Sequence, residues 1–61
     1  MKGLFEVTAR SSNKVITGEV YGSLSEKQTL FARLMNRFKV KISDRYKWKL
    51  QDVKLKKQID D

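Results

Sequence analysis

The chain is short and basic. Its 61 residues include 14 Lys and Arg against seven Asp and Glu, which gives a formal net charge of +7. A domain of this size buries only about 60% of the surface of its unfolded chain, so a homo-oligomer is as much expected as a monomer. The chain has no cysteine and no histidine, which excludes disulfide bonds, the usual zinc sites and catalysis by a thiol or an imidazole.

Targeting and membrane segments are not visible in the sequence. An alternating segment follows Met1-Lys2-Gly3 where a signal peptide would carry an apolar run. No stretch approaches the roughly 20 apolar residues that a membrane-spanning helix needs. The sequence therefore predicts a cytoplasmic protein without membrane contact.

The first third of the chain alternates between apolar and polar residues. This pattern predicts two half-buried strands, at residues 4–10 and 15–21, joined by a polar turn at residues 11–14. Within that turn Asn13 is a residue that can adopt the left-handed conformation. The strands would form a hairpin whose core face carries Phe5, Val7, Ala9, Ile16 and Val20.

The stretch from Ser23 to Lys39 is the one segment with helical spacing. Its apolar residues fall on one stripe of a helix and are the best core candidates: Leu30, Phe31, Leu34, Met35 and Phe38. Two pairs fit the pattern of an N-terminal capping box, Ser23 with Glu26 and Ser25 with Gln28. Gly18, on the core face of the second strand, leaves room for a large helix side chain such as that of Phe31.

Residues 38–50 alternate strictly, with the apolar side chains at even positions. Two arrangements satisfy this pattern: one long strand bent at Asp44, or a hairpin with the loop Ser43-Asp44-Arg45. Beyond Leu50 the apolar residues shift to odd positions, which suggests a turn at residues 51–52 and a last strand at residues 53–57. Residues 58–61 are expected to fray.

These elements define the expected fold as one small α+β domain over residues 1–61. Along the chain the elements would follow in the order ββαββ, or ββαβ with one long bent third strand. The strands would form one small antiparallel sheet, and the single amphipathic helix would pack on one face of it. Such a domain leaves the opposite face of the sheet to solvent.

The positive charge lies in the second half of the chain. Residues 1–26 carry three basic and three acidic side chains, whereas residues 27–57 carry eleven basic and two acidic ones. This asymmetry points to an anionic partner for the second half, although lysines also keep sheet edges from pairing. If residues 38–57 are strands, six lysines line the sheet face away from the helix: Lys39, Lys41, Lys47, Lys49, Lys54 and Lys56.

Three further residues are candidate contacts. Arg33 and Arg37 lie four residues apart on the exposed side of the helix, where they can meet phosphates or carboxylates. Tyr21 shares the polar face of its strand and can contact a base or a protein. By contrast, alternation places Tyr46 and Trp48 on the face opposite the lysines, which favours core packing over base stacking.

Little in the sequence supports catalysis. The seven carboxylates are scattered, and no glycine-rich phosphate loop is present. We therefore expect a protein without catalytic residues, metal, cofactor or small-molecule substrate. The favoured function is a small basic module that contacts the nucleic-acid backbone through the lysine-rich sheet face. The alternative is a protein-interaction module, a regulator or inhibitor of phage or mobile-element type, that docks on an acidic partner protein.

Overall fold

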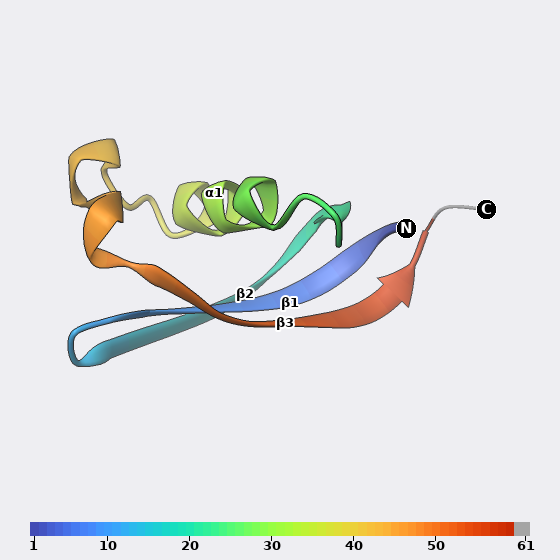
Figure 1. The fold of residues 1–61 in the computed structure, drawn as a ribbon, viewed down its shortest axis with the longest axis horizontal. Helices are drawn as coiled ribbons and strands as arrows, with labels where there is room; N and C mark the ends of the chain where they lie inside the picture. Colours follow the sequence, from blue (N-terminus) through green and yellow to red (C-terminus); the bar gives the residue numbers. More distant parts are fainter. Residues whose placement is uncertain (60–61) are drawn as a thin grey trace.

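The computed structural model describes residues 1–59, which form three strands, one α-helix and one 3₁₀ helix. The elements follow in the order β1 (Lys2–Ser11), β2 (Lys14–Ser23), α1 (Lys27–Arg37), η1 (Ile42–Lys47) and β3 (Lys49–Gln58). The strands form one antiparallel sheet in the order β2-β1-β3, so the first strand of the chain is the central one. Figure 1 shows α1 on one side of this sheet. The predicted α+β class is confirmed. The sheet has three strands and not the four of the ββαββ order, and its third strand begins only at Lys49.

The core lies between α1 and the sheet and draws its side chains from β1, β2 and α1. Its buried members are Phe5, Val7, Ala9, Val20, Leu30, Leu34 and Met35. Ile16 and Phe31 are partly buried and pack against them. Phe38 is 42% exposed, so its prediction as a core residue was wrong. It follows the last turn of α1 as the C-terminal cap residue and lies towards the rim of the core.

Two glycines of β2 allow α1 to approach the sheet closely. A methyl group added to Gly22 would come within 2.5 Å of Leu30 Cδ2, and one added to Gly18 within 3.0 Å of Leu34 Cδ1. The side chain nearest to Gly18 is that of Phe38, at 2.9 Å from the added carbon, and not that of Phe31 as the sequence suggested. Both glycines therefore serve the packing of the helix on β2.

The turns at either end of the core depart from the predicted details. The hairpin loop consists of residues 12 and 13, and Ser12, not Asn13, has a positive φ of 32°. The N-cap position of α1 is Glu26, which makes no side-chain capping hydrogen bond, and the Ser23 hydroxyl lies 2.9 Å from that of Ser25 instead. Both proposed capping boxes are therefore absent.

The end of α1 is a Schellman motif built without glycine. The backbone amide of Val40 donates to the Met35 carbonyl at 2.9 Å, and that of Lys39 donates to the Asn36 carbonyl at 3.1 Å. Lys39 takes the left-handed conformation that this motif requires, with a φ of 54°. The chain thus reverses at Lys39, where the sequence pattern had suggested the start of a strand.

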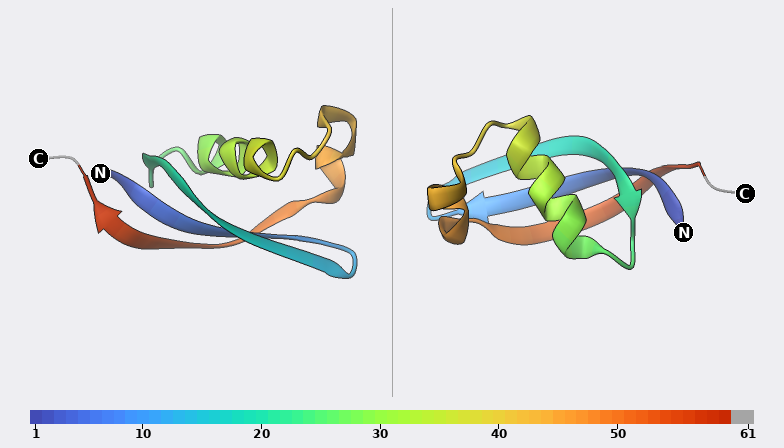
Figure 2. Two further views of the ribbon diagram at one scale, coloured as in Figure 1. Left: turned by 180° about the vertical axis from the view of Figure 1, so that it is seen from behind. Right: turned by 90° about the horizontal axis from the view of Figure 1, so that it is seen from above.

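Neither predicted arrangement of residues 38–50 is present. Residues 42–47 form η1, and Ile42 and Tyr46, expected to face the core, are 81% and 78% exposed. The reason is geometric. The chain leaves α1 near Gly18, in the middle of β2, and passes through η1 over the tip of the hairpin. β3 then starts opposite Arg10 near that tip, so the second edge of β1 is left to residues 49–58 (Figure 2).

The shift of apolar residues from even to odd positions is caused by a β-bulge and not by a turn. Ala9 pairs with Leu50 while Thr8 pairs with Asp52, so Gln51 is the extra residue. The bulge brings Leu50, Val53 and, further along, Leu55 opposite the core positions of β1 within one continuous strand. A second register shift leaves Lys56 as an extra residue.

The two ends of the described chain lie side by side (Figure 1). Gln58 pairs with Gly3, and the amide of Ile59 donates to the Lys2 carbonyl at 3.1 Å. The sequence predicted fraying from residue 58, whereas β3 includes that residue; residues 60–61 lie outside the described part. Within residues 1–59, no helix is long and apolar enough to cross a membrane.

Candidate functional site

A groove lies at the end of the molecule formed by the β1–β2 turn. One wall is that turn, and the other is the segment that links α1 to η1 together with part of η1. Its volume is about 480 Å³. Both views of Figure 2 place η1 over the tip of the hairpin. Two segments almost 30 residues apart in the sequence thus share one concave surface.

This groove is lined by four lysines: Lys14 from the start of β2, Lys39 and Lys41 from the linking segment, and Lys47 from η1. We call it the lysine groove. Its one acidic lining residue is Asp44, whose Oδ1 lies 3.8 Å from Lys47 Nζ. That ion pair is about half exposed and therefore weak. The lining keeps a formal charge of +3 and so favours an anionic ligand.

Hydrogen-bonding groups stand beside these charges. Ser11, Ser12 and Asn13 line the same groove and offer hydroxyl and amide groups. Such groups, together with lysines, are the ones that proteins use for phosphate oxygens. The lining is thus chemically suited to a phosphate-bearing ligand.

Arg45 fixes the wall of the groove to the end of α1. Its Nη2 donates to Asn36 Oδ1 at 2.6 Å and its Nε donates to the Val40 carbonyl at 3.3 Å. Both partners belong to the C-terminal end of α1 and the residues after it. Arg45 therefore acts as a positioning residue that holds η1 against the helix.

Aromatic side chains border the groove. Phe38 and Trp48 line it, and Trp48 also packs partly against the core. Tyr46 projects from η1 and is 78% exposed, with Lys47 Nζ 5.9 Å from its ring centroid. The prediction that Tyr46 packs in the core was therefore wrong, while Trp48 partly fulfils it.

The six lysines predicted to line one sheet face do not lie together. Lys39, Lys41 and Lys47 are outside the sheet and belong to the lysine groove, and only three are on β3. That prediction was wrong because residues 38–48 form no strand.

The outer face of the sheet carries mixed charges. Lys49 lies opposite Arg10, and Lys54 opposite Glu6. Glu6 also lies beside Glu19 in the register, and its Oε2 is 3.9 Å from Lys56 Nζ. Acidic side chains thus interrupt the basic ones on this face.

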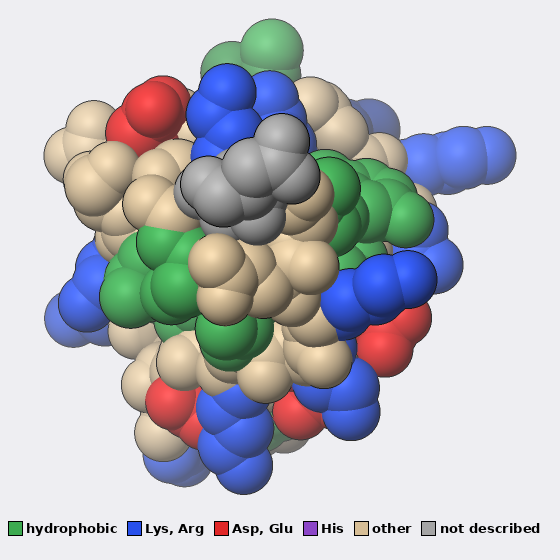
Figure 3. Space-filling model, turned by 90° about the vertical axis from the view of Figure 1, so that its right-hand side faces the viewer, with side chains coloured by type: hydrophobic (Ala, Val, Ile, Leu, Met, Phe, Trp, Pro, Cys, Tyr) green, Lys and Arg blue, Asp and Glu red, His purple; other side chains and the backbone are tan. Residues whose placement is uncertain are grey.

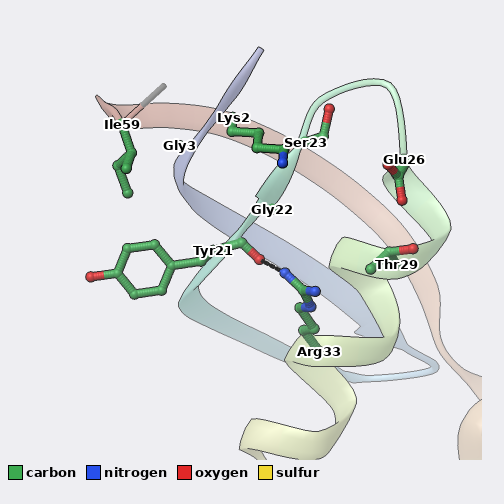
Figure 4. A pocket seen from close by; sticks show the side chains of 9 residues that line it. All are labelled: Lys2, Gly3, Tyr21, Gly22, Ser23, Glu26, Thr29, Arg33 and Ile59. Carbon is green, nitrogen blue, oxygen red and sulfur yellow. Dashed lines mark hydrogen bonds between the residues drawn. The ribbon is translucent and has the colours of Figure 1, made fainter. Parts of the chain in front are cut away.

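The two helix arginines contact the sheet. The Arg33 guanidinium donates to the Tyr21 carbonyl, and Arg37 Cδ lies 3.3 Å from the position of a methyl group on Gly18. Tyr21 itself is 62% exposed, and its ring points away from Arg33 (Figure 4). Tyr21 and Arg33 are remote from the lysine groove, since both line a pocket at the other end of the molecule. Arg37 directly precedes the groove residues Phe38 and Lys39 but is not itself part of the lining.

A second pocket, of about 350 Å³, lies at that other end (Figure 4). It is bordered by Lys2, Arg33 and Glu26, and two glycines, Gly3 and Gly22, leave room for it. Figure 3 views this end and shows basic, acidic and hydrophobic side chains interspersed over it. The charges here are mixed, in contrast to the lysine groove.

The comparisons give this chain no relative: no family model, no curated protein and no solved structure matches it. Among residues 1–59, no cluster of three metal-ligating side chains was found. Sequence reasoning missed Lys14 as a lining residue of the groove and misplaced Tyr46 in the core. Lys14 joins the groove only through the tertiary fold, so no local pattern could reveal it. For Tyr46, the missing glycine in the proposed loop at residues 43–45 was a signal against the hairpin.

Proposed function

We propose that this protein is a non-catalytic module that binds the backbone of nucleic acid in the lysine groove. The convergence of Lys14, Lys39, Lys41 and Lys47 on one concave surface with a single carboxylate carries the proposal. Phosphate contacts of this kind supply affinity without sequence information, so binding should depend little on sequence. We still predict that the protein is cytoplasmic and that it forms a homo-oligomer as readily as a monomer.

The test is a titration of binding against salt. Four lysine–phosphate contacts predict a slope of log K against log[salt] of about −3.6 on duplex and about −2.8 on single strands. Between 50 and 200 mM salt the affinity should then fall roughly 150-fold or 50-fold, respectively. No binding to either form at low salt would refute the proposal.

Two triple variants with equal charge change locate the site. Replacing Lys14, Lys41 and Lys47 by Gln should lower the magnitude of the slope by about two to three. Replacing Lys54, Lys56 and Lys57 on β3 by Gln should leave it near the wild-type value. An equal loss in both variants would instead indicate attraction by net charge alone.

A second candidate function is docking on an acidic protein. It rests on Ile42 and Tyr46, the two most exposed large apolar side chains of the described residues. Exposed apolar groups next to lysines suit a partner with an apolar and acidic surface. A purified complex with one protein that survives nuclease treatment and is lost in Ile42→Ser would favour this candidate.

A further inference from the structure

We propose that the ligand of the lysine groove is single-stranded nucleic acid, with Tyr46 stacking on a base. This inference rests on the proposed function and adds the class of nucleic acid. It starts from the position of Tyr46, which projects from η1 next to a groove-lining lysine and is 78% exposed.

Burial in the core does not explain an aromatic side chain at position 46. It is absent from the hydrophobic core and from the partly buried residues around it. Lys47 Nζ lies 5.9 Å from the centroid of the Tyr46 ring, and an exposed contact of this type is weak. Its aromatic surface is therefore available to a ligand.

The surroundings of Tyr46 combine the two features by which proteins hold single strands. Lys47 lines the groove and lies near the ring, so a phosphate in the groove and a base on Tyr46 would belong to one bound strand. In a duplex the bases are stacked within the helix and their faces are not accessible. Only an unpaired base can stack on an exposed ring, which favours the single strand.

The chain contains its own reporter for the test. Trp48 is the only tryptophan and lines the groove, so its fluorescence should change when a ligand enters. We would titrate the protein with oligothymidine and oligouridine of about 12 nucleotides and with a duplex of about the same length. The expected result is tighter binding of both single strands than of the duplex at equal salt.

Substitutions at two exposed tyrosines separate stacking from charge. Tyr46→Ala should weaken single-strand binding by about five-fold to about 150-fold while leaving duplex binding unchanged. Tyr46→Phe should keep the affinity, because the ring is retained. Tyr21→Ala is the matched control, since Tyr21 is also exposed but lies at the other end of the molecule. Thermal unfolding should show both alanine variants folded, as neither side chain is buried.

The outcomes distinguish this inference from the proposed function. Equal or tighter binding of the duplex, or a Tyr46→Ala variant with wild-type affinity for single strands, would overturn the inference alone. Absence of binding to every oligonucleotide would overturn both. If Tyr46→Ala lowered the affinity for duplex and single strand equally, the ring would not act by stacking on an unpaired base. That result would also overturn the inference.

Discussion

Replacing Lys39 by glycine should stabilise the fold and weaken ligand binding at the same time. Lys39 holds a φ of 54° at the end of α1, where it closes the Schellman motif. A left-handed conformation costs a non-glycine residue about 1–2 kcal/mol. Glycine removes this cost but adds about 0.5–1 kcal/mol of backbone entropy to the unfolded state. The net stabilisation should be about 0.5–1 kcal/mol.

For a domain of this size, that gain corresponds to a rise of about 4–8 °C in the melting temperature. Urea unfolding followed by Trp48 fluorescence would measure the free energy, and circular dichroism would measure the melting temperature. In the binding assay, the loss of one groove lysine should lower the salt slope on single strands by about 0.7. Stability and affinity should therefore move in opposite directions.

Lys41→Gly is the matched control for this prediction. Lys41 also lines the groove, but its φ of −61° and ψ of 143° are ordinary extended values. Glycine there relieves no strain and should destabilise by about 0.5–1 kcal/mol, while the loss of binding should match that of Lys39→Gly. If both variants changed stability in the same direction, the assignment of strain to Lys39 would be refuted.

Three further predictions concern the supports of the fold and the groove. Gly22→Ala should destabilise by about 1–2 kcal/mol in urea unfolding, because its methyl group would displace the buried Leu30; a neutral result would mean that α1 shifts freely on β2. Arg45→Met should lower single-strand affinity although Arg45 is outside the groove lining, because η1 loses its hydrogen bond to Asn36; unchanged affinity would contradict its positioning role. Ser12→Gly should raise the melting temperature by a few degrees, about 3 °C, by relieving the positive φ; a lower value would show that Ser12 makes a compensating contact.

The parts of the fold with local patterns could be predicted from the sequence. The hairpin follows from alternation at Phe5, Val7 and Ala9, and the helix from the spacing of Leu30, Leu34 and Met35. These patterns are reliable because each face must bury its own apolar residues against the other element. The antiparallel pairing of β1 and β2 and the core face of the hairpin accordingly match the expectation.

The region after α1 could not be predicted, because two different structures share its pattern. An alternating segment such as residues 38–50 fits a strand, but here residues 42–47 form η1 and pairing with β1 begins only at Lys49. The bulge at Gln51 similarly imitates a turn, since either one moves the apolar residues from even to odd positions. Distinguishing these cases requires knowing which edge of β1 is free.

Only part of the candidate site could be predicted from the sequence, because the rest depends on the tertiary fold. Lys39, Lys41 and Lys47 were singled out by charge, which a sequence shows directly. Their partner Lys14 lies in the half of the chain whose charges balance, and only the folding of η1 over the hairpin tip brings it to them. The sequence placed the candidate binding surface on a face of the sheet, whereas the structure places it at the end of the molecule formed by the β1–β2 turn.

The pairing of β1 with β3 has a mechanical consequence. The Ile59 amide donates a hydrogen bond to the Lys2 carbonyl, and the two strands are antiparallel. A force that pulls these two ends apart therefore acts first on the hydrogen bonds at this end of the β1–β3 pair. The hydrogen bonds between the strands would then break one after another, as in a zipper, and not all together. The molecule should yield to a small force whatever its thermal stability. Peeling would run from Gln58 towards Lys49 and would reach the wall of the lysine groove last.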